Sequence, residues 1–171
     1  MPSTISLFAS SRRNGNTGKF MDRIAKEVAI EVVDLTPLNL SPYDYDHQNR
    51  SDDFEPLMQK VLGFDQIIFA TPIYWYAASP PMKVFLDRIS DFLDLPDLLE
   101  DGRRLRGKRA FVVCTSIYDE AAPSFTNAFL ETFTYLGMRY GGTGHINCRD
   151  GYIPAIHDPI AAAFAQSIAR A

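Results

Sequence analysis

Cysteine is scarce in this sequence, and neither copy lies in a pattern typical of metal binding or redox exchange. Cys114 and Cys148 are isolated, with no Cys-x-x-Cys pair and no spacing of metal ligands around them. Isolated cysteines of this kind are typical of proteins in a reducing compartment. The sequence therefore predicts no metal site and favours a cytoplasmic location.

Long apolar runs and an excess of basic residues are also missing. No run approaches the length of a membrane-spanning helix, and the first ten residues lack the basic leader and apolar core of a signal peptide. The formal net charge of −4 argues against a nucleic-acid surface. We therefore expect neither membrane nor nucleic acid as a partner. Apolar residues make up 46% of the chain, a globular composition, so we expect one domain over residues 1–171.

Apolar segments rich in β-branched and aromatic residues alternate with segments of helical periodicity. This alternation predicts right-handed crossovers and a parallel sheet covered by helices on both faces. Five strands and five helices favour a doubly wound α/β sheet in the order 2-1-3-4-5, the order in which flavodoxin binds FMN at the switch point. The predicted strands cover residues 5–9, 30–35, 66–71, 109–116 and 139–147.

The helical segments contain apolar residues that recur every three or four positions. One apolar face begins at Phe54, and another runs from Met82 to Asp94 after two prolines suited to a helix start. A later helix is expected to end at Gly137 as the residue after its C-cap. The last helix is predicted to open with Asp158 as its cap and Pro159 as its first helical residue.

The loop after the first predicted strand presents hydroxyl, amide and guanidinium groups just before a helix. Free N–H groups and the helix dipole favour an anion at such a position. Gly15 allows a positive φ there, and the loop matches neither a dinucleotide fingerprint nor a P-loop. A solvated loop with Asn16 or Thr17 as the helix cap would explain the same residues without a ligand. We predict a site for a terminal phosphate, formed by Ser10, Arg12, Asn16 and Thr17.

Aromatic residues follow the third predicted strand, on the other side of the expected switch point. Pro72 fixes a turn there, and Tyr74 and Trp75 offer flat apolar surface with polar tips, as an isoalloxazine ring requires. Packing of these rings beneath their own loop is the alternative. The loop after the fourth strand would lie next to them, with Ser116 and Tyr118 as the expected contacts.

Other polar residues do not form a recognisable catalytic group. Lys83, Asp87 and Arg88 are expected to form a solvated helix face or part of a subunit interface. The three histidines, His47, His145 and His157, lack a spaced acidic partner and are expected to be structural or on the surface. We therefore predict no catalytic side chain.

Two of these segments resemble the NADPH-dependent FMN reductase family. Residues 9–17, ASSRRNGNT, resemble its GSPRKNGNT-type phosphate loop, and residues 71–88, TPIYWYAASPPMKVFLDR, resemble its TPIYW…MKxFxDR signature. Residues 105–116 are similar to its fourth strand. The resemblance implies a flavodoxin-like fold, non-covalent FMN and reduction by NADH or NADPH. It also implies phosphate contacts from Ser10, Arg12, Asn16 and Thr17, and ring contacts from Pro72, Ile73, Tyr74 and Trp75.

The sequence departs from the family pattern at two places. Ala9 and Ser11 replace the glycine and proline at the start of the phosphate loop, which is a mild change. The branch with an iron–sulfur cluster has clustered cysteines where residues 41–52 contain none. We therefore expect no cluster.

Three functions share these residues. The first is an NAD(P)H-dependent oxidoreductase that passes electrons to a flavin, a quinone or another small acceptor. The second is a flavodoxin-type electron carrier, and the third is a flavin-binding module without turnover. Electron carriers tend to have an acidic face around the flavin. Here Arg12, Arg13 and Arg50 offset the negative charge of the nearby acidic residues, so the oxidoreductase is favoured.

We also expect a homodimer or homotetramer with the flavins near the interface. Residues 36–52, with Tyr43, Tyr45 and His47, and the helix from Met82 to Asp94 offer aromatic and ionic surface beside the site. Two-fold pairing of these surfaces would shield the flavin from water. The alternative is a monomer in which both tyrosines fold back on their own domain.

Overall fold

A parallel sheet forms the centre of the molecule, whose computed structural model describes residues 2–171. Its strands are β1 (Thr4–Phe8), β2 (Glu31–Asp34), β3 (Gln66–Tyr74), β4 (Ala77–Ala78), β5 (Arg109–Ser116) and β6 (Arg139–Asn147). The parallel strands are ordered β2-β1-β3-β5-β6, and β4 forms a short antiparallel hairpin with β3. Without β4, this order is the predicted 2-1-3-4-5, so the flavodoxin-like doubly wound sheet is confirmed.

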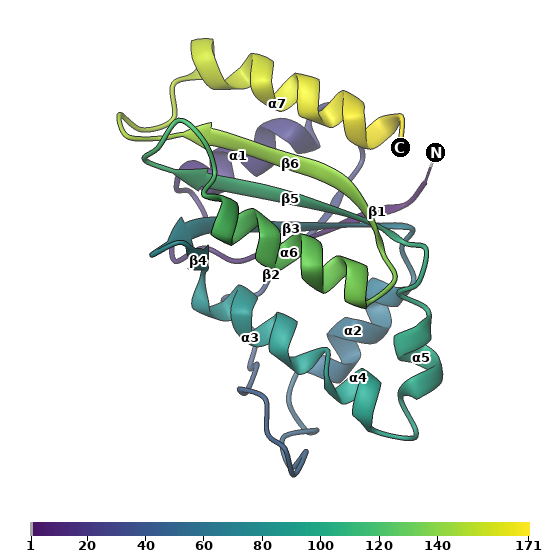
Figure 1. Cartoon of the computed structure of the whole chain (residues 1–171). Coiled ribbons are helices and arrows are strands. Elements are labelled where there is room, and N and C mark those ends of the chain that lie inside the picture. The colour runs from purple at the N-terminus through teal and green to yellow at the C-terminus, as the bar shows by residue number, and fades with distance from the viewer. Residues whose placement is uncertain (1) are drawn as a thin grey trace.

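Helices cover both faces of the sheet (Figure 1). The helices are α1 (Asn16–Ala25), α2 (Phe54–Leu62), α3 (Pro80–Arg88), α4 (Asp91–Asp94), α5 (Leu99–Arg103), α6 (Pro123–Tyr135) and α7 (Pro154–Ala169). α1 and α7 pack on one face, and α2 to α6 lie on the other. The described helices outnumber the five predicted because α4 and α5 are single short turns.

Alternating side chains of the central strands form two cores, one on each face. In β3, Ile67 and Phe69 belong to the core under α2 to α6, whereas Ile68 and Ala70 belong to the core under α1 and α7. A strand covered on both faces is apolar at successive positions, which explains its unbroken apolar run. The central strands are therefore packed on both faces, and the loops at their carboxyl ends extend from this packed sheet.

The helix predicted from Met82 to Asp94 is interrupted. α3 ends at Arg88 and α4 begins at Asp91, because the backbone hydrogen bonds between them span three residues instead of four. One of them joins the Ser90 N–H to the Asp87 carbonyl at 3.2 Å. Such tightened turns are common where an α-helix ends.

Arg88, the last residue of α3, forms a buried ion pair, which corrects the prediction of a solvated face. Lys83 and Asp87 do form an exposed i,i+4 ion pair. The Arg88 side chain is only 1% exposed, and it donates hydrogen bonds to Asp52, with Nη1–Oδ2 at 2.5 Å, and to Asp91, with Nε–Oδ2 at 2.7 Å. Arg88 therefore stabilises the fold.

The long loop after β2 folds back onto α4. His47 Nδ1 lies 2.9 Å from Asp91 Oδ1, and the Tyr43 hydroxyl donates to Asp94 Oδ2 at 3.1 Å. His47 thus has an acidic partner distant in the sequence, which local spacing could not reveal. Two of the side chains expected to meet a second subunit therefore contact their own domain.

The last helix begins five residues earlier than predicted, with Ile153 as its N-cap and Pro154 as its first residue. The side chain of His157 reaches back, and its Nδ1 accepts a hydrogen bond from the Ile153 N–H at 2.9 Å. This contact satisfies a free donor at the helix start, so Asp158 is not the cap. Pro159 lies inside the helix, beyond its first turn, so its missing N–H leaves the Ala155 carbonyl without its intrahelical donor. The predicted end at Gly137 is confirmed by its φ of +70° after α6.

Candidate functional site

A cleft of about 650 Å³ lies at the carboxyl ends of β1, β3 and β5. This is the switch point of the strand order, where doubly wound sheets bind ligands. All ten residues predicted as site residues line the cleft: Ser10, Arg12, Asn16, Thr17, Pro72, Ile73, Tyr74, Trp75, Ser116 and Tyr118. Sequence reasoning did not assign seven other lining residues: Ser11, Gly15, Tyr76, Thr115, Ile117, Ala122 and Cys148.

The N-terminus of α1 opens into one end of the cleft. Gly15 is the N-cap with φ −73°, so it does not adopt the positive φ that glycine allows. No side chain caps this helix, which contradicts the alternative of a solvated loop capped by Asn16 or Thr17. The hydroxyl of Thr17 instead lies 2.8 Å from that of Thr115 at the end of β5. The first-turn N–H groups of α1 have no intrahelical partner, which leaves them available to an anion.

Two adjacent arginines in this loop have different environments. Arg13 forms an ion pair with Asp22 and lies over the ring of Phe8 at 4.9 Å. Arg12 is exposed, lines the cleft and forms no ion pair within residues 2–171. The loop is pressed closely onto the helix, since a Cβ at Gly18 would lie 1.8 Å from the Arg13 carbonyl oxygen. Arg12 is therefore the arginine that can neutralise an anion in the cleft.

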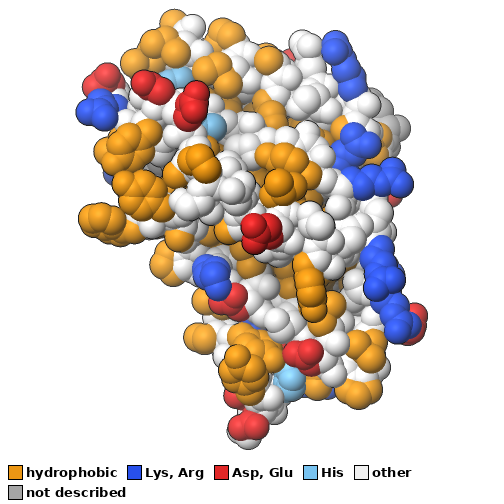
Figure 2. Space-filling model, viewed as in Figure 1, with side chains coloured by type: hydrophobic (Ala, Val, Ile, Leu, Met, Phe, Trp, Pro, Cys, Tyr) orange, Lys and Arg blue, Asp and Glu red, His pale blue; other side chains and the backbone are white. Residues whose placement is uncertain are grey.

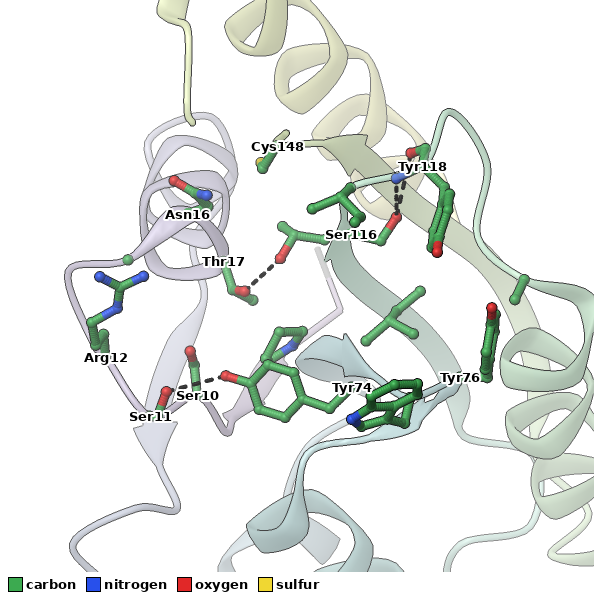
Figure 3. A pocket seen from close by; sticks show the side chains of 17 residues that line it. Ser10, Ser11, Arg12, Asn16, Thr17, Tyr74, Tyr76, Ser116, Tyr118 and Cys148 are labelled. Carbon is green, nitrogen blue, oxygen red and sulfur yellow. Dashed lines mark hydrogen bonds between the residues drawn. The ribbon is translucent and has the colours of Figure 1, made fainter. Parts of the chain in front are cut away.

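Buried hydroxyls join the end of β3 to the loop after β1. Ser79 donates from its N–H to Thr71 Oγ1 at 2.9 Å and from its hydroxyl to the Ala9 carbonyl at 2.8 Å. Nearer the surface, the Tyr74 hydroxyl lies 3.1 Å from Ser11 Oγ, with its ring across the floor of the cleft (Figure 3). These contacts fix the two loops relative to each other.

Strained backbone shapes the opposite side of the cleft. Trp75 and Tyr76 form the two-residue turn of the β3–β4 hairpin, with φ of +49° and +64°. Both positions of such a turn require positive φ, which Asn-Gly adopts readily and bulky residues do not. Each such residue costs roughly 1–2 kcal/mol. The Trp75 side chain is 94% exposed, so burial of its ring does not offset the strain.

The loop after β5 is held by side chains from the end of β6. Ser116 Oγ lies 2.9 Å from His145 Nε2 and accepts a hydrogen bond from the Tyr118 N–H at 3.1 Å. The Asn147 side-chain amide donates to Asp119 Oδ1 at 2.7 Å. Burial lowers the pKa of His145, against the opposing effect of nearby carboxylates. The loop therefore presents Tyr118 from a supported position, although it contains no glycine.

Cys148 lies at the cleft without the properties of a reactive thiol. It is buried, and burial raises its pKa to about 11. The thiolate is the reactive form of cysteine, so such a thiol reacts slowly at neutral pH. Within residues 2–171, no three His, Cys, Asp or Glu side chains are grouped in a way that could hold a metal ion. The groups that the cleft offers to a ligand are therefore an anion site, hydroxyl groups and aromatic rings.

Among the helices within residues 2–171, none is both long and apolar enough to cross a membrane. Hydrophobic side chains do gather at the edge where the strands end, whereas Lys and Arg side chains line the opposite edge (Figure 2). The apolar edge coincides with the cleft.

Known proteins share this fold and sequence pattern. YwqN of Bacillus subtilis (strain 168), whose assignment as an NAD(P)H-dependent FMN-containing oxidoreductase is provisional, is 27% identical over 163 residues, or 90% of each chain. The Trp repressor binding protein of Bacillus subtilis superposes with a TM-score of 0.76 at 22% identity, covering 98% of this chain and 99% of that one. A protein of P. pentosaceus described as NADPH-quinone reductase superposes with a TM-score of 0.69 at 17% sequence identity, covering 97% of this chain and 96% of that one.

The sequence also matches a family as a whole. The model of the NADPH-dependent FMN reductase family matches residues 2–151, which include the α1 loop, the β3–β4 hairpin and the end of β6. The match thus extends over every loop that forms the cleft. The chain belongs to the NADPH-dependent FMN reductase family.

Proposed function

We propose that the cleft binds FMN with its phosphate at the N-terminus of α1 and its ring between the β3 and β5 loops. The uncapped first turn of α1 is the observation that supports this most directly. Arg12 supplies a positive charge there, and Ser10, Asn16 and Thr17 supply polar groups. At the other end, Tyr74 and Trp75 supply flat apolar surface. The residues present therefore fit a flat ligand that carries a terminal phosphate.

Family membership makes this protein an FMN-dependent NAD(P)H oxidoreductase. In the overall reaction, NAD(P)H gives up a hydride, and the acceptor takes up two electrons and two protons, the second proton coming from water. FMN supplies the redox chemistry when bound. The chain positions the reactants and keeps water from the ring, which agrees with a cleft that lacks an acid–base pair.

A small molecule is the acceptor that the rim of the cleft favours. No carboxylate lines the cleft, and the rim is made mainly of aromatic and hydroxyl groups. A carrier that docks on another protein through an acidic face would need Asp or Glu here. The cleft volume of about 650 Å³ also lies within the range usual for small-molecule sites. The geometry therefore supports a reductase over a flavodoxin-type carrier.

Reconstitution with FMN tests the proposal directly. The purified protein, incubated with FMN and desalted, should show a flavin absorption spectrum, and it should oxidise NADPH or NADH when a quinone is added. Mass analysis of the released cofactor should give FMN. Binding without turnover would favour the carrier or the non-catalytic module, and a protein that cannot be loaded would contradict the site.

We further propose a cytoplasmic homodimer, or a homotetramer built from it. Tyr45 is 87% exposed, and an apolar groove of about 380 Å³ runs between α3, α4 and α6. Leu86, Leu93 and Tyr135 line this groove, and Tyr135 is 81% exposed. Burial of such surface between subunits is favourable. Light scattering on the FMN-loaded protein at micromolar concentration should give a dimer or tetramer mass, and a monomer mass would contradict it.

A further inference from the structure

His145 in β6 contacts the wall of the cleft without lining it. Its Nε2 lies 2.9 Å from Oγ of Ser116, and Ser116 is one of the lining residues. His145 is the register partner of Cys114 and lies on the face of the sheet covered by α6. The side chain is partly buried, and the short contact to Ser116 connects it to the cleft. An effect of His145 on a ligand is therefore expected through the Ser116 hydroxyl.

The hydrogen-bond partners of Ser116 leave little freedom to its hydroxyl group. A serine hydroxyl has one hydrogen to donate and two lone pairs that accept. Oγ of Ser116 accepts a hydrogen bond from the Tyr118 N–H at 3.1 Å (Figure 3). Its own hydrogen can go to the Tyr118 carbonyl at 3.3 Å or to His145 Nε2 at 2.9 Å. The shorter contact favours His145 as the acceptor, which leaves the second lone pair of Ser116 free.

Protonation of His145 reverses this arrangement. Both ring nitrogens of a protonated histidine donate, so Nε2 then donates to Ser116 Oγ. The lone pairs of Ser116 are then occupied by the His145 Nε2–H and the Tyr118 N–H, and the hydroxyl hydrogen is left for a ligand. Neutral His145 thus makes Ser116 an acceptor toward the cleft, and charged His145 makes it a donor.

The surroundings of His145 keep it neutral at neutral pH. The charged or titratable side chains of the adjoining segments are Cys114 of β5, Asp119 and Glu120 of the next loop, Glu131 of α6 and Arg149 after β6. Burial lowers the pKa of His145, and Asp119 and Glu120 oppose this effect. Cys114 is uncharged, because burial raises its pKa to about 12. His145 therefore gains its proton below the ordinary histidine pKa of about 6.5.

We propose that His145 is a positioning residue for FMN, which it influences by making the Ser116 hydroxyl an acceptor toward the ring when uncharged and a donor when protonated. This inference rests on the proposed function, because it concerns the ring that the cleft would hold. The imide N–H of an isoalloxazine matches the acceptor form of Ser116. Oxidised FMN should therefore bind best when His145 is neutral, and its affinity should fall as the pH falls through the pKa of His145.

The test measures the Kd for FMN at about pH 7.5 and about pH 5, on either side of the histidine titration. Quenching of Trp75, the only tryptophan, reports binding. His145→Gln keeps a polar side chain that does not titrate, Ser116→Ala removes the hydroxyl, and a double variant carries both changes. His47→Gln replaces a histidine outside the cleft lining and is the matched control. The FMN phosphate titrates near pH 6 with every protein, so it cancels from the comparison.

The Kd of the wild type should rise between the two pH values about threefold to tenfold more than that of His145→Gln, the factor expected for one hydrogen bond. Ser116→Ala and the double variant should match His145→Gln, and His47→Gln should match the wild type. A histidine that only supports the fold would change the Kd by the same factor at both pH values. That result, or an effect of His145→Gln that persists without the Ser116 hydroxyl, overturns the proposal.

The same titrations separate this proposal from the function on which it rests. If the wild type does not bind FMN at either pH, the proposed function and the role of His145 both fail. Binding with the same pH dependence in the wild type and in His145→Gln rejects the role of His145 alone.

Discussion

The guanidinium of Arg88 at the end of α3 is paired with the carboxylate of Asp52 in the loop before α2, and both side chains are almost fully buried. Arg88 Nη1 also donates to the Ser41 carbonyl at 3.0 Å. Burial alone would raise the pKa of Asp52, but the hydrogen bonds from Arg88 and from the Ser41 and Phe54 N–H groups outweigh it and lower that pKa. The ion pair thus connects the long loop between β2 and α2 to the end of α3.

Removing Arg88 should therefore destabilise the protein strongly. Arg88→Ala leaves Asp52 and Asp91 buried without their shared cation, a loss of about 3–5 kcal/mol in the free energy of unfolding. Lys83→Ala breaks an exposed ion pair on the same helix and should cost less than about 1 kcal/mol. Urea unfolding measures both variants. Equal small losses would show that the buried pair contributes little.

The sequence predicts the strand order and the position of the site because local patterns determine them. Strands buried on both faces have to be continuously apolar, so β3 and β5 could be recognised from their residues. The carboxyl ends of parallel strands meet at one edge, which places the residues after β1, β3 and β5 in one cleft.

Other features depend on contacts between distant residues and could not be read from local patterns. Arg88 has the sequence context of a solvated residue, and only the tertiary fold brings Asp52 to it. Similarly, His157 displaces Asp158 as the group that satisfies the start of α7. The positive φ at Tyr76 was not predicted, because the rules for turns associate positive φ with glycine or asparagine.

Replacing the arginine that faces the cleft should weaken FMN binding, whereas replacing its neighbour should not. A charge-assisted hydrogen bond contributes roughly 1.5–3 kcal/mol, so Arg12→Ala should raise the Kd for FMN about tenfold or more. Asn16→Ala should weaken FMN binding in the same direction. Arg13→Ala is the matched control, because Arg13 is engaged with Asp22 and Phe8. Fluorescence titration measures all three, and an unchanged Kd in both cleft variants would contradict the phosphate site.

Folding stability should depend on pH through His145. Its pKa in the folded protein is lowered by burial, whereas the unfolded chain has the ordinary value of about 6.5. Below that value the unfolded state binds a proton that the folded state does not, so the free energy of unfolding falls as the pH falls. His145→Gln keeps a polar group near Ser116 and should show a smaller decline between about pH 6.5 and 5. Identical pH profiles in the two proteins would exclude this role, since the other histidines are common to both.

The thiol of Cys148 should react slowly despite lining the cleft. With a pKa of about 11, against about 8.5 for a free thiol, its thiolate fraction at pH 8 is lower by roughly a hundredfold or more. In a Cys114→Ser background, iodoacetamide should therefore modify Cys148 far more slowly than it modifies a cysteine in a short peptide. Modification at the peptide's rate would show that the thiol is open to solvent and ionises normally.

Relieving the strain at Tyr76 should make the protein more stable. Glycine avoids the left-handed cost of roughly 1–2 kcal/mol, and its extra freedom in the unfolded chain offsets about 0.5–1 kcal/mol of this gain. Tyr76→Gly should therefore raise the free energy of unfolding by about 0.5–1 kcal/mol, because the half-exposed ring contributes little burial. Tyr135→Gly, at the exposed last residue of α6, should lower it by up to about 0.5 kcal/mol, because glycine is a weaker helix former than tyrosine. Urea unfolding of the apoprotein distinguishes the two signs, and a loss of stability in Tyr76→Gly would mean that the ring contributes more than its backbone costs.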